Sequence, residues 1–591
     1  MPGVWMAARD PADVGGDEPR WSGYGLEVLD HLRAPWRQVT TAELGRTDGG
    51  VGTLVLSNPS DLPGQDAATV ADWVRRGGRL LLIGGAGPLA GLAGVVEVEP
   101  IDEGHVYVDP TAPGGEVVDV GVRAFGGVRL RVESAQPLAW WDRDRSADRV
   151  AICSRRAGWG RCVVLGPDVW QTIVRIQQGW PVVTDGVPAP DGSAPVDDGI
   201  LKSDDAISLS YTEDRGPSDR TALKRGAFRH RYPAVERPPF FHRAQADLWR
   251  TILVRTLWSL ESEAGHPSVW LHYWPAGVEA VAHLSHDTDG NRDHEAEAAL
   301  EVFDEAGVRT TWCFLYPGGL SPGTVQAVRD AGHELALHFN ALDDLPGCGW
   351  GPDELRRQRD WLSDLVGSPV LTNKNHFLRW EGWDEFFVWS ERLGIQLDQS
   401  HGPSKQGNVG FPFGSCHLSF PMLREGRRCE VLTLPLQCQD LALTTPVANR
   451  DLLVEQVRAV HGVFHCLFHG ANIAQHPEVR AAVLDTVAAV RRDGLPWWTS
   501  AELNAWERAR RGVDLRVDPL GDSWLVRAHS RLEMRNAGVM VALPGGIEGE
   551  WHLARGCGEL RTVVRHDVTQ LEIATDLPKG GESVFVISRS S

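Results

Sequence analysis

The chain has 591 residues, of which 42% are hydrophobic and 23% are charged. This is the composition of a globular chain, and the length suggests three or four domains at about 100–200 residues each. The net charge of -20 argues against nucleic acid as a main partner and against an anionic membrane surface, because both bind through basic residues. No apolar run approaches the ~20 residues of a membrane helix, so we expect no membrane insertion.

The first residues of the chain lack a basic start followed by an apolar stretch, so the sequence predicts no signal peptide. The nine Cys residues include no C-x-x-C pair. Scattered cysteines in apolar runs are typical of reduced core thiols. We therefore expect a cytoplasmic protein.

Residues 1–181 are predicted to form a parallel α/β domain. Apolar runs at 53–57 and 79–83 have strand length, and the helical spacing at 66–76 lies between them. A strand, a helix and a strand in this order predict parallel pairing. The pattern V-L-S-N…V-x-x-G-G-R-L-L-L-I-G-G resembles glutamine-amidotransferase-like domains. Because no Cys precedes Cys153, we expect this domain to lack the nucleophile of those enzymes and to be non-catalytic.

Two regions carry no helical pattern. Residues 182–242 are rich in Pro, Gly, Asp and Ser and are interpreted as a connector. Residues 511–591 contain short alternating runs separated by Gly, Pro and Asp. This pattern predicts a small β-rich, sandwich-like domain, which we expect to support its neighbour.

Residues 243–510 alternate between strand and helix patterns. Seven or eight such units in this length predict a (β/α) barrel of seven to eight strands. The predicted strands cover 279–286, 309–315, 334–338, 370–376, 395–398, 431–436 and 463–468. The predicted helices cover 244–262, 294–306, 353–366, 449–460 and 477–493, and Ser321-Pro322 predicts a further helix start.

Polar residues follow several of these strands, at the barrel end where active sites lie. Asp287 and Asp289 follow the first strand, so one carboxylate could bind a cation while the other acts as a base. His338 and His469 close later strands. Any one of these residues alone is more simply a structural residue, but several strand ends of one barrel carrying Asp or His favour an active site.

The region from about 275 to 505 resembles the polysaccharide deacetylase (NodB-homology) family. The resemblance rests on S-H-D-T-D-G at 285–290 and G-H-E-L-A-L-H at 332–338, with weaker support from L-R-W at 378–380 and L-F-H at 467–469. It implies that Asp287 is the general base and that His469 is the general acid for the leaving amine.

The resemblance also implies that Arg379 orients or tunes the base, and that Asp289 and His338 bind a divalent metal, with zinc the leading candidate. The family usually has a second His four residues after the first, but this chain has Leu342 there. Catalytic zinc usually has three protein ligands. We therefore expect His376, next to the Arg motif on a neighbouring strand, to be the replacement. Asn340, His401 and His417 are weaker candidates.

The function predicted from the sequence is metal-dependent hydrolysis of a C–N amide bond, as in the de-N-acetylation of an amino sugar in a glycan or glycan precursor. The partner would then be a carbohydrate or amino-sugar substrate. Two alternatives remain: a non-catalytic glycan-binding or scaffolding protein on a degenerate barrel, and a hydrolase of a small non-sugar amide. Convergence of a third ligand on Asp289 and His338 would separate the hydrolases from the binding protein.

Overall fold

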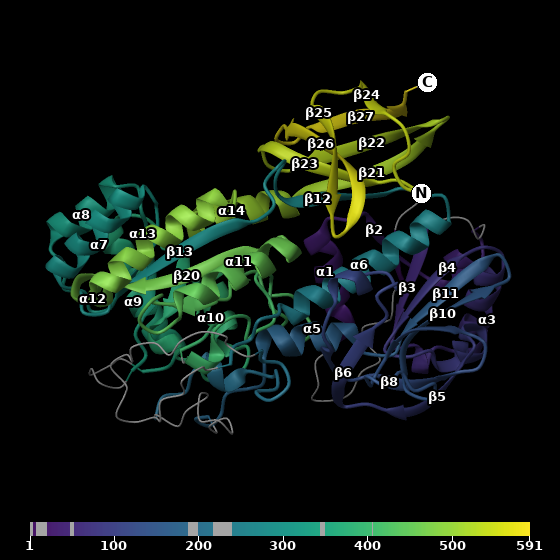
Figure 1. Cartoon of the computed structure of the whole chain (residues 1–591), viewed down its shortest axis with the longest axis horizontal. Helices are drawn as coiled ribbons and strands as arrows, with labels where there is room; N and C mark the ends of the chain where they lie inside the picture. The colour runs from purple at the N-terminus through teal and green to yellow at the C-terminus, as the bar shows by residue number, and fades with distance from the viewer. Residues whose placement is uncertain are drawn as a thin grey trace. The chain divides into compact units, whose positions relative to one another are not determined.

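The computed structural model describes residues 4–7, 21–47, 52–186, 199–216, 239–342, 349–404 and 406–590 (Figure 1). The contacts between residues divide the chain into two compact units. Unit 1 contains Met1–Ile173, Leu248–Gly277 and Arg508–Ser591, and unit 2 contains Val174–Asp247 and Val278–Glu507. The two units are defined by contacts between residues, whereas we predict the domain boundaries from sequence composition. The predicted boundaries therefore stay a prediction.

The first sheet of unit 1 is built around the predicted strand–helix–strand unit, which is confirmed as β3 (Thr53–Ser57), α3 (Gly64–Arg75) and β4 (Arg79–Ile83) with β3 and β4 parallel. β11 (Gly160–Leu165) extends this parallel part beside β4. Beyond β11 the sheet continues with antiparallel strands, starting with β10 (Val150–Ala157), because a short hairpin joins β10 to β11.

The other elements of this sheet and its neighbourhood are β1 (Val4–Ala7), α1 (Tyr24–Leu32), β2 (Trp36–Val39), α2 (Thr41–Leu44), α4 (Ala90–Ala93), β5 (Val95–Pro100), β6 (Glu103–Val108), β7 (Val122–Phe125), β8 (Val128–Val132) and β9 (Gln136–Trp140). The helices α5 (Val169–Gln178) and α6 (Gln245–Glu263) follow in the chain. In the part of the chain that the structure describes, no helix is both long enough and apolar enough to cross a membrane.

The second β region of unit 1 consists of two four-stranded antiparallel sheets, as the alternating runs at the C-terminal end predict. Their C-terminal strands are β21 (Val513–Leu520), β22 (Ser523–Ser530), β23 (Met534–Ala542), β24 (Trp551–Arg555), β25 (Glu559–Arg565), β26 (Val568–Leu577) and β27 (Glu582–Arg589). The eighth strand is β12 (Ser268–Pro275), which pairs with β23 although the two are far apart in the sequence. No strand is predicted at β12 from the sequence.

Unit 2 contains a sheet in which every neighbouring pair of strands is parallel, in the order β18-β17-β16-β15-β14-β13-β20-β19. The strands are β13 (Val281–Asp287), β14 (Thr311–Leu315), β15 (Glu334–Phe339), β16 (Thr372–Asn375), β17 (Leu397–Asp398), β18 (Leu432–Thr433), β19 (Cys438–Gln439) and β20 (Val463–His469). The helices of this unit include α7 (Asp293–Ala306), α8 (Pro322–Asp330), α9 (Pro352–Val366), α10 (Glu385–Leu393), α11 (Val447–Val460), α12 (Gly470–Gln475) and α13 (Pro477–Arg492), and α14 (Ser500–Arg511) follows them.

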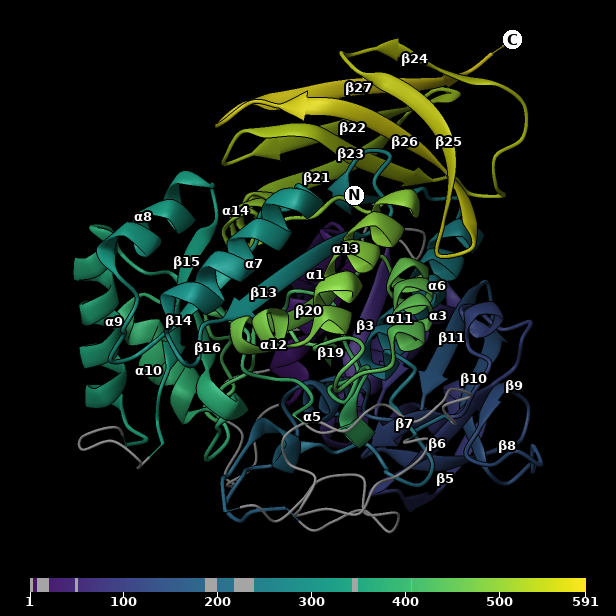
Figure 2. The same cartoon turned by 60° about the vertical axis from the view of Figure 1, so that its left-hand side comes forward.

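The two ends of this sheet belong to one stretch of chain. β18 pairs with β17, and four residues later β19 pairs with β20, so the stretch from Leu432 to Gln439 joins the two edges. A sheet of parallel strands whose edges are joined in this way is a β/α barrel, and the predicted fold class is confirmed. Figure 2 shows α7, α8 and α9 outside the curved sheet. As predicted, the Ser321 side chain caps α8 by accepting a hydrogen bond from the backbone N–H of Thr324.

The described part of the connector packs within unit 2. Val182 forms a β-bridge with Gly382, and Lys202 forms one with Arg379. The buried carboxylate of Asp204 accepts hydrogen bonds from Ser404. The connector therefore braces the loop that follows β16.

Candidate metal centre and its surroundings

The strands of the barrel direct polar side chains inward because successive side chains of a strand alternate between its faces. On β13 this places His283, Ser285 and Asp287 on one face, and all three are buried. On β20 the same alternation places His469 at the end of the strand, directly opposite Asp287 in the register. The carboxyl ends of neighbouring parallel strands thus bring a carboxylate and an imidazole together at one end of the barrel.

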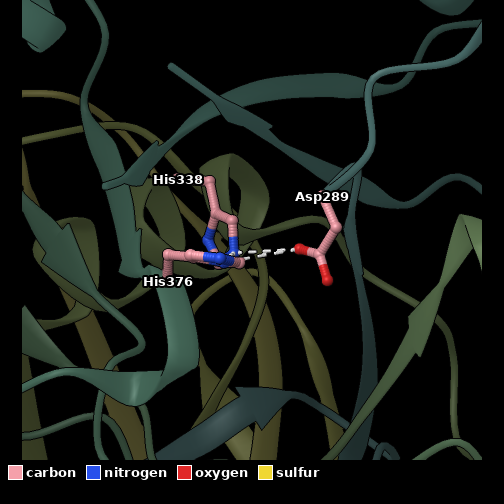
Figure 3. Close-up of side chains that lie close together, drawn as sticks. All are labelled: Asp289, His338 and His376. Carbon is pink, nitrogen blue, oxygen red and sulfur yellow. Dashed lines mark hydrogen bonds and ion pairs between the residues drawn. The ribbon is translucent and has the colours of Figure 1, made fainter. Parts of the chain in front are cut away.

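Three side chains from three strand ends converge at this end of the barrel (Figure 3). Nε2 of His338 lies 3.4 Å from Oδ1 of Asp289, and Nδ1 of His376 lies 3.6 Å from the same oxygen. The two imidazole nitrogens are 3.1 Å apart. Asp289 reaches this position from a turn in which its φ is 35°, directly after the residue that follows β13.

Two of the converging atoms can act as acceptors. Nδ1 of His338 lies 3.0 Å from the backbone carbonyl oxygen of Lys374, and in the tautomer that donates to this oxygen Nε2 carries a lone pair toward Asp289. Oδ1 of Asp289 is buried and has no hydrogen-bond partner among the described residues. A cation between Nε2 of His338 and Oδ1 of Asp289 would satisfy both atoms, so this group is suited to a metal ion.

The spacing also fits a small divalent ion. Zinc lies about 2.0–2.2 Å from nitrogen and oxygen ligands in a tetrahedral site, which separates the ligand atoms by about 3.4 Å. The three separations here are 3.1, 3.4 and 3.6 Å. Asp289, His338 and His376 are the group of this kind found in the described part of the chain. Three protein ligands leave a fourth position open, as in catalytic zinc sites.

Asp287 lies beside this group and contacts a buried cation. Nζ of Lys374 is 3.3 Å from Oδ1 of Asp287 and 2.5 Å from the Ser285 hydroxyl oxygen. Burial alone would raise the pKa of Asp287, but the nearby charge of Lys374 is the largest of the influences that outweigh burial and lower it. Asp287 is therefore an anion at neutral pH although its side chain is only 4% exposed.

His469 is held by a second carboxylate. Nδ1 of His469 donates to Oδ2 of Asp440 at 2.6 Å, and its backbone N–H donates to the other oxygen at 2.9 Å. Nε2 of His469 lies 3.7 Å from Oδ2 of Asp289. Burial opposes the charge on the ring, but the carboxylates of Asp440 and Asp289 outweigh it and raise the pKa of His469 to about 10. The ring is thus oriented and protonated at neutral pH.

The remaining candidate residues lie elsewhere. The Arg379 guanidinium forms an ion pair with Glu381, and the cation that contacts Asp287 is Lys374. The Asn340 side chain binds backbone groups, and Nε2 of His417 lies 2.7 Å from the carbonyl oxygen of Val460. His401 packs against three aromatic rings, those of Trp380, Phe387 and Phe413. None of these contacts places Arg379, Asn340, His401 or His417 in the group that could hold a metal.

Neither Lys374 nor Asp440 is predicted as a site residue from the sequence. Lys374 lies in T-N-K-N, a strand without apolar residues. The sequence therefore does not indicate which face of β16 lies inside the barrel. Asp440 follows β19, which has only two residues and no recognisable period. A lysine two residues before a candidate ligand is the one signal that could have found Lys374.

No family model matches the sequence, and no curated protein sequence matches it. Solved structures that match include a protein from Mycobacterium smegmatis provisionally named a polysaccharide deacetylase, with 17% identity, coverage of 40% of this chain and 93% of that chain, and a TM-score of 0.32. PuuE allantoinase matches with 11% identity, the same two coverages of 40% and 93%, and a TM-score of 0.31.

A β-galactosidase from Rahnella sp. R3 matches with 15% identity over 28% of this chain and a TM-score of 0.23. The chain spans 29% of the length of that enzyme and 27% of the β-galactosidase from G. stearothermophilus. These TM-scores are too low for the likenesses to carry an argument. The resemblance to the polysaccharide deacetylases therefore rests on the sequence motifs, and the amidotransferase-like resemblance of residues 1–181 stays a prediction.

Proposed function

We propose that the chain is a metal-dependent hydrolase of a C–N amide bond, and that its substrate is an N-acetylated amino sugar in a glycan or glycan precursor. The observation that carries the proposal is the convergence of Asp289, His338 and His376 on one point, with a buried carboxylate oxygen that lacks a hydrogen-bond partner. Zinc is the ion we expect, since one carboxylate and two imidazoles are among its usual ligands.

A bound divalent ion would polarise the acyl carbonyl and lower the pKa of water at its open position. Asp287 is suited to accept the proton of that water because it lies 3.7 Å from the His338 ligand atom and is kept anionic by Lys374. His469 is suited to protonate the leaving nitrogen because Asp440 orients its ring and keeps it charged. The acid and the base approach from adjacent strands and can act on opposite ends of the scissile bond.

Metal content tests the first step of this proposal. Elemental analysis of the wild-type protein after addition of zinc is expected to give about one ion per chain, as one catalytic site holds. Asp289→Ala and His376→Ala should each lose that ion. His294→Ala is the matched control, because His294 is an exposed histidine of α7 in the same unit and should leave the zinc content unchanged.

Acetate release from N-acetylglucosamine oligomers tests the second step. We expect release by the zinc-loaded protein and none after Asp287→Asn. Failure of the wild-type protein to bind zinc would reject the hydrolase and favour a glycan-binding or scaffolding protein. Bound zinc with hydrolysis of small amides, but none of amino sugars, would favour the non-sugar amide hydrolase.

A further inference from the structure

The loop after β16 has an unusual backbone next to the candidate metal ligand His376. Phe377 and Leu378 have φ values of 57° and 54°, in the left-handed region that favours glycine. A non-glycine residue there is strained and persists only where the surroundings enforce the conformation. Such conformations gather at functional sites, so the side chains that this loop presents are candidates for a functional role.

The surroundings of this loop hold it firmly. The backbone N–H of Arg379 donates to the carbonyl oxygen of His376 at 3.0 Å, and the Asn375 side chain donates to the carbonyl oxygen of Arg379 at 2.9 Å. The Leu378 side chain is buried with Leu436 and Leu467. Leu378 thus anchors the turn, and the conformation of Phe377 is imposed by these contacts.

Phe377, by contrast, is 37% exposed. The centroid of its ring lies 4.5 Å from that of His376, with the two rings nearly perpendicular. Leu371, another exposed apolar residue of unit 2, instead precedes the opposite end of β16. The strained turn therefore holds an aromatic ring at the side of the candidate metal centre.

From this we infer that Phe377 contacts the substrate and selects a ring-bearing glycan, by packing against the apolar C–H face of a sugar ring whose acyl group reaches the metal centre. An exposed aromatic ring on a rigid loop binds at little entropic cost, because the ring is already in place. A small acyclic amide has no such face and would gain little from the contact. The inference rests on the proposed function and names the residue that would favour its glycan substrate over a small amide.

Phe377→Gly is the informative variant, because glycine removes the ring and also relieves the left-handed backbone. We expect about tenfold weaker binding of an N-acetylglucosamine tetramer to the metal-free protein by calorimetry, and a similar rise in KM with little change in kcat for the zinc-loaded protein. The free energy of unfolding and the zinc content should not fall. Phe377→Tyr should keep most of the affinity.

Leu371→Ala is the matched control, because Leu371 is 38% exposed and precedes the opposite end of β16. It should bind the tetramer as the wild-type protein does. Wild-type affinity in Phe377→Gly would overturn the inference, and so would equal losses in Phe377→Gly and Leu371→Ala. If the wild-type protein and Phe377→Gly hydrolyse the tetramer equally well, only the role of Phe377 is contradicted. If the zinc-loaded wild-type protein hydrolyses no amide, the proposed function itself is contradicted.

Discussion

The ammonium group of Lys374 lies 3.3 Å from Oδ1 of Asp287, and the two side chains are 0% and 4% exposed. The same ammonium also donates to Ser285, whose hydroxyl oxygen lies 2.9 Å from Nε2 of His465. A buried pair of this kind is costly to break, because the group that remains is an unpaired buried charge. The pair therefore connects the stability of the barrel to the charge of Asp287, the proposed base.

Removal of one partner should destabilise the protein more than removal of both charges. Lys374→Met is expected to lower the free energy of unfolding of the barrel by about 3–5 kcal/mol, since Asp287 is left without a cation. The double variant Lys374→Met/Asp287→Asn should recover part of that loss. Urea denaturation of the wild-type protein, the two single variants and the double variant measures this coupling, and simple additivity would contradict it.

Asp440 should matter for catalysis without holding the metal. Asp440→Asn removes the carboxylate that orients and charges His469, so we expect kcat to fall by about 10²- to 10⁴-fold while zinc content stays at the wild-type level. Asp353→Asn, which changes a 91% exposed carboxylate on α9, serves as the control. An unchanged kcat in Asp440→Asn would remove His469 from the mechanism as we describe it.

Zinc should stabilise the folded barrel by mass action. At a free zinc concentration of 100 times Kd, binding to one site adds about 2.7 kcal/mol to the free energy of unfolding. Thermal unfolding with and without a chelator should show a higher Tm in zinc. The increase is expected to vanish in Asp289→Asn, and a persisting increase would indicate that zinc binds elsewhere.

The burial of His401 predicts that the protein loses stability in acid. Burial among aromatic rings lowers the pKa of His401 to about 3, below the ordinary value of 6.5. Between about pH 6.5 and pH 3 the unfolded chain binds a proton at His401 that the folded chain does not bind. The contribution of His401 to the free energy of unfolding is therefore fully present above pH 6.5 and is lost as the pH falls.

At pH 5 this loss amounts to about 2 kcal/mol for the single group. His401→Phe keeps a ring among Trp380, Phe387 and Phe413 but cannot be protonated. Urea midpoints at pH 7.5 and pH 5 should therefore differ less in this variant than in the wild-type protein. An equal difference in both proteins would show that His401 does not titrate in this way.

The sequence predicted the barrel well because each strand and helix has its own local period, and α9 and β20 lie within a few residues of their predicted ranges. The position of His376 beside Asp289 and His338 could be predicted, because a residue at the end of a parallel strand can be placed once the strand is recognised. Asp440 could not, because β19 is too short to show a period. β12 was missed because its apolar run is recognisable as a strand only with its partner β23, more than 250 residues later.

The pairing of β12 with β23 has a consequence for synthesis on the ribosome. The strand is made before the barrel, but its partner leaves the ribosome only after all of Val278–Glu507 has been translated. During that interval an apolar strand with tryptophans at 270 and 274 has an unpaired edge, which is the kind of surface that chaperones cover. Expression of residues 243–510 alone would make that interval permanent, because β12 would then be present without β23.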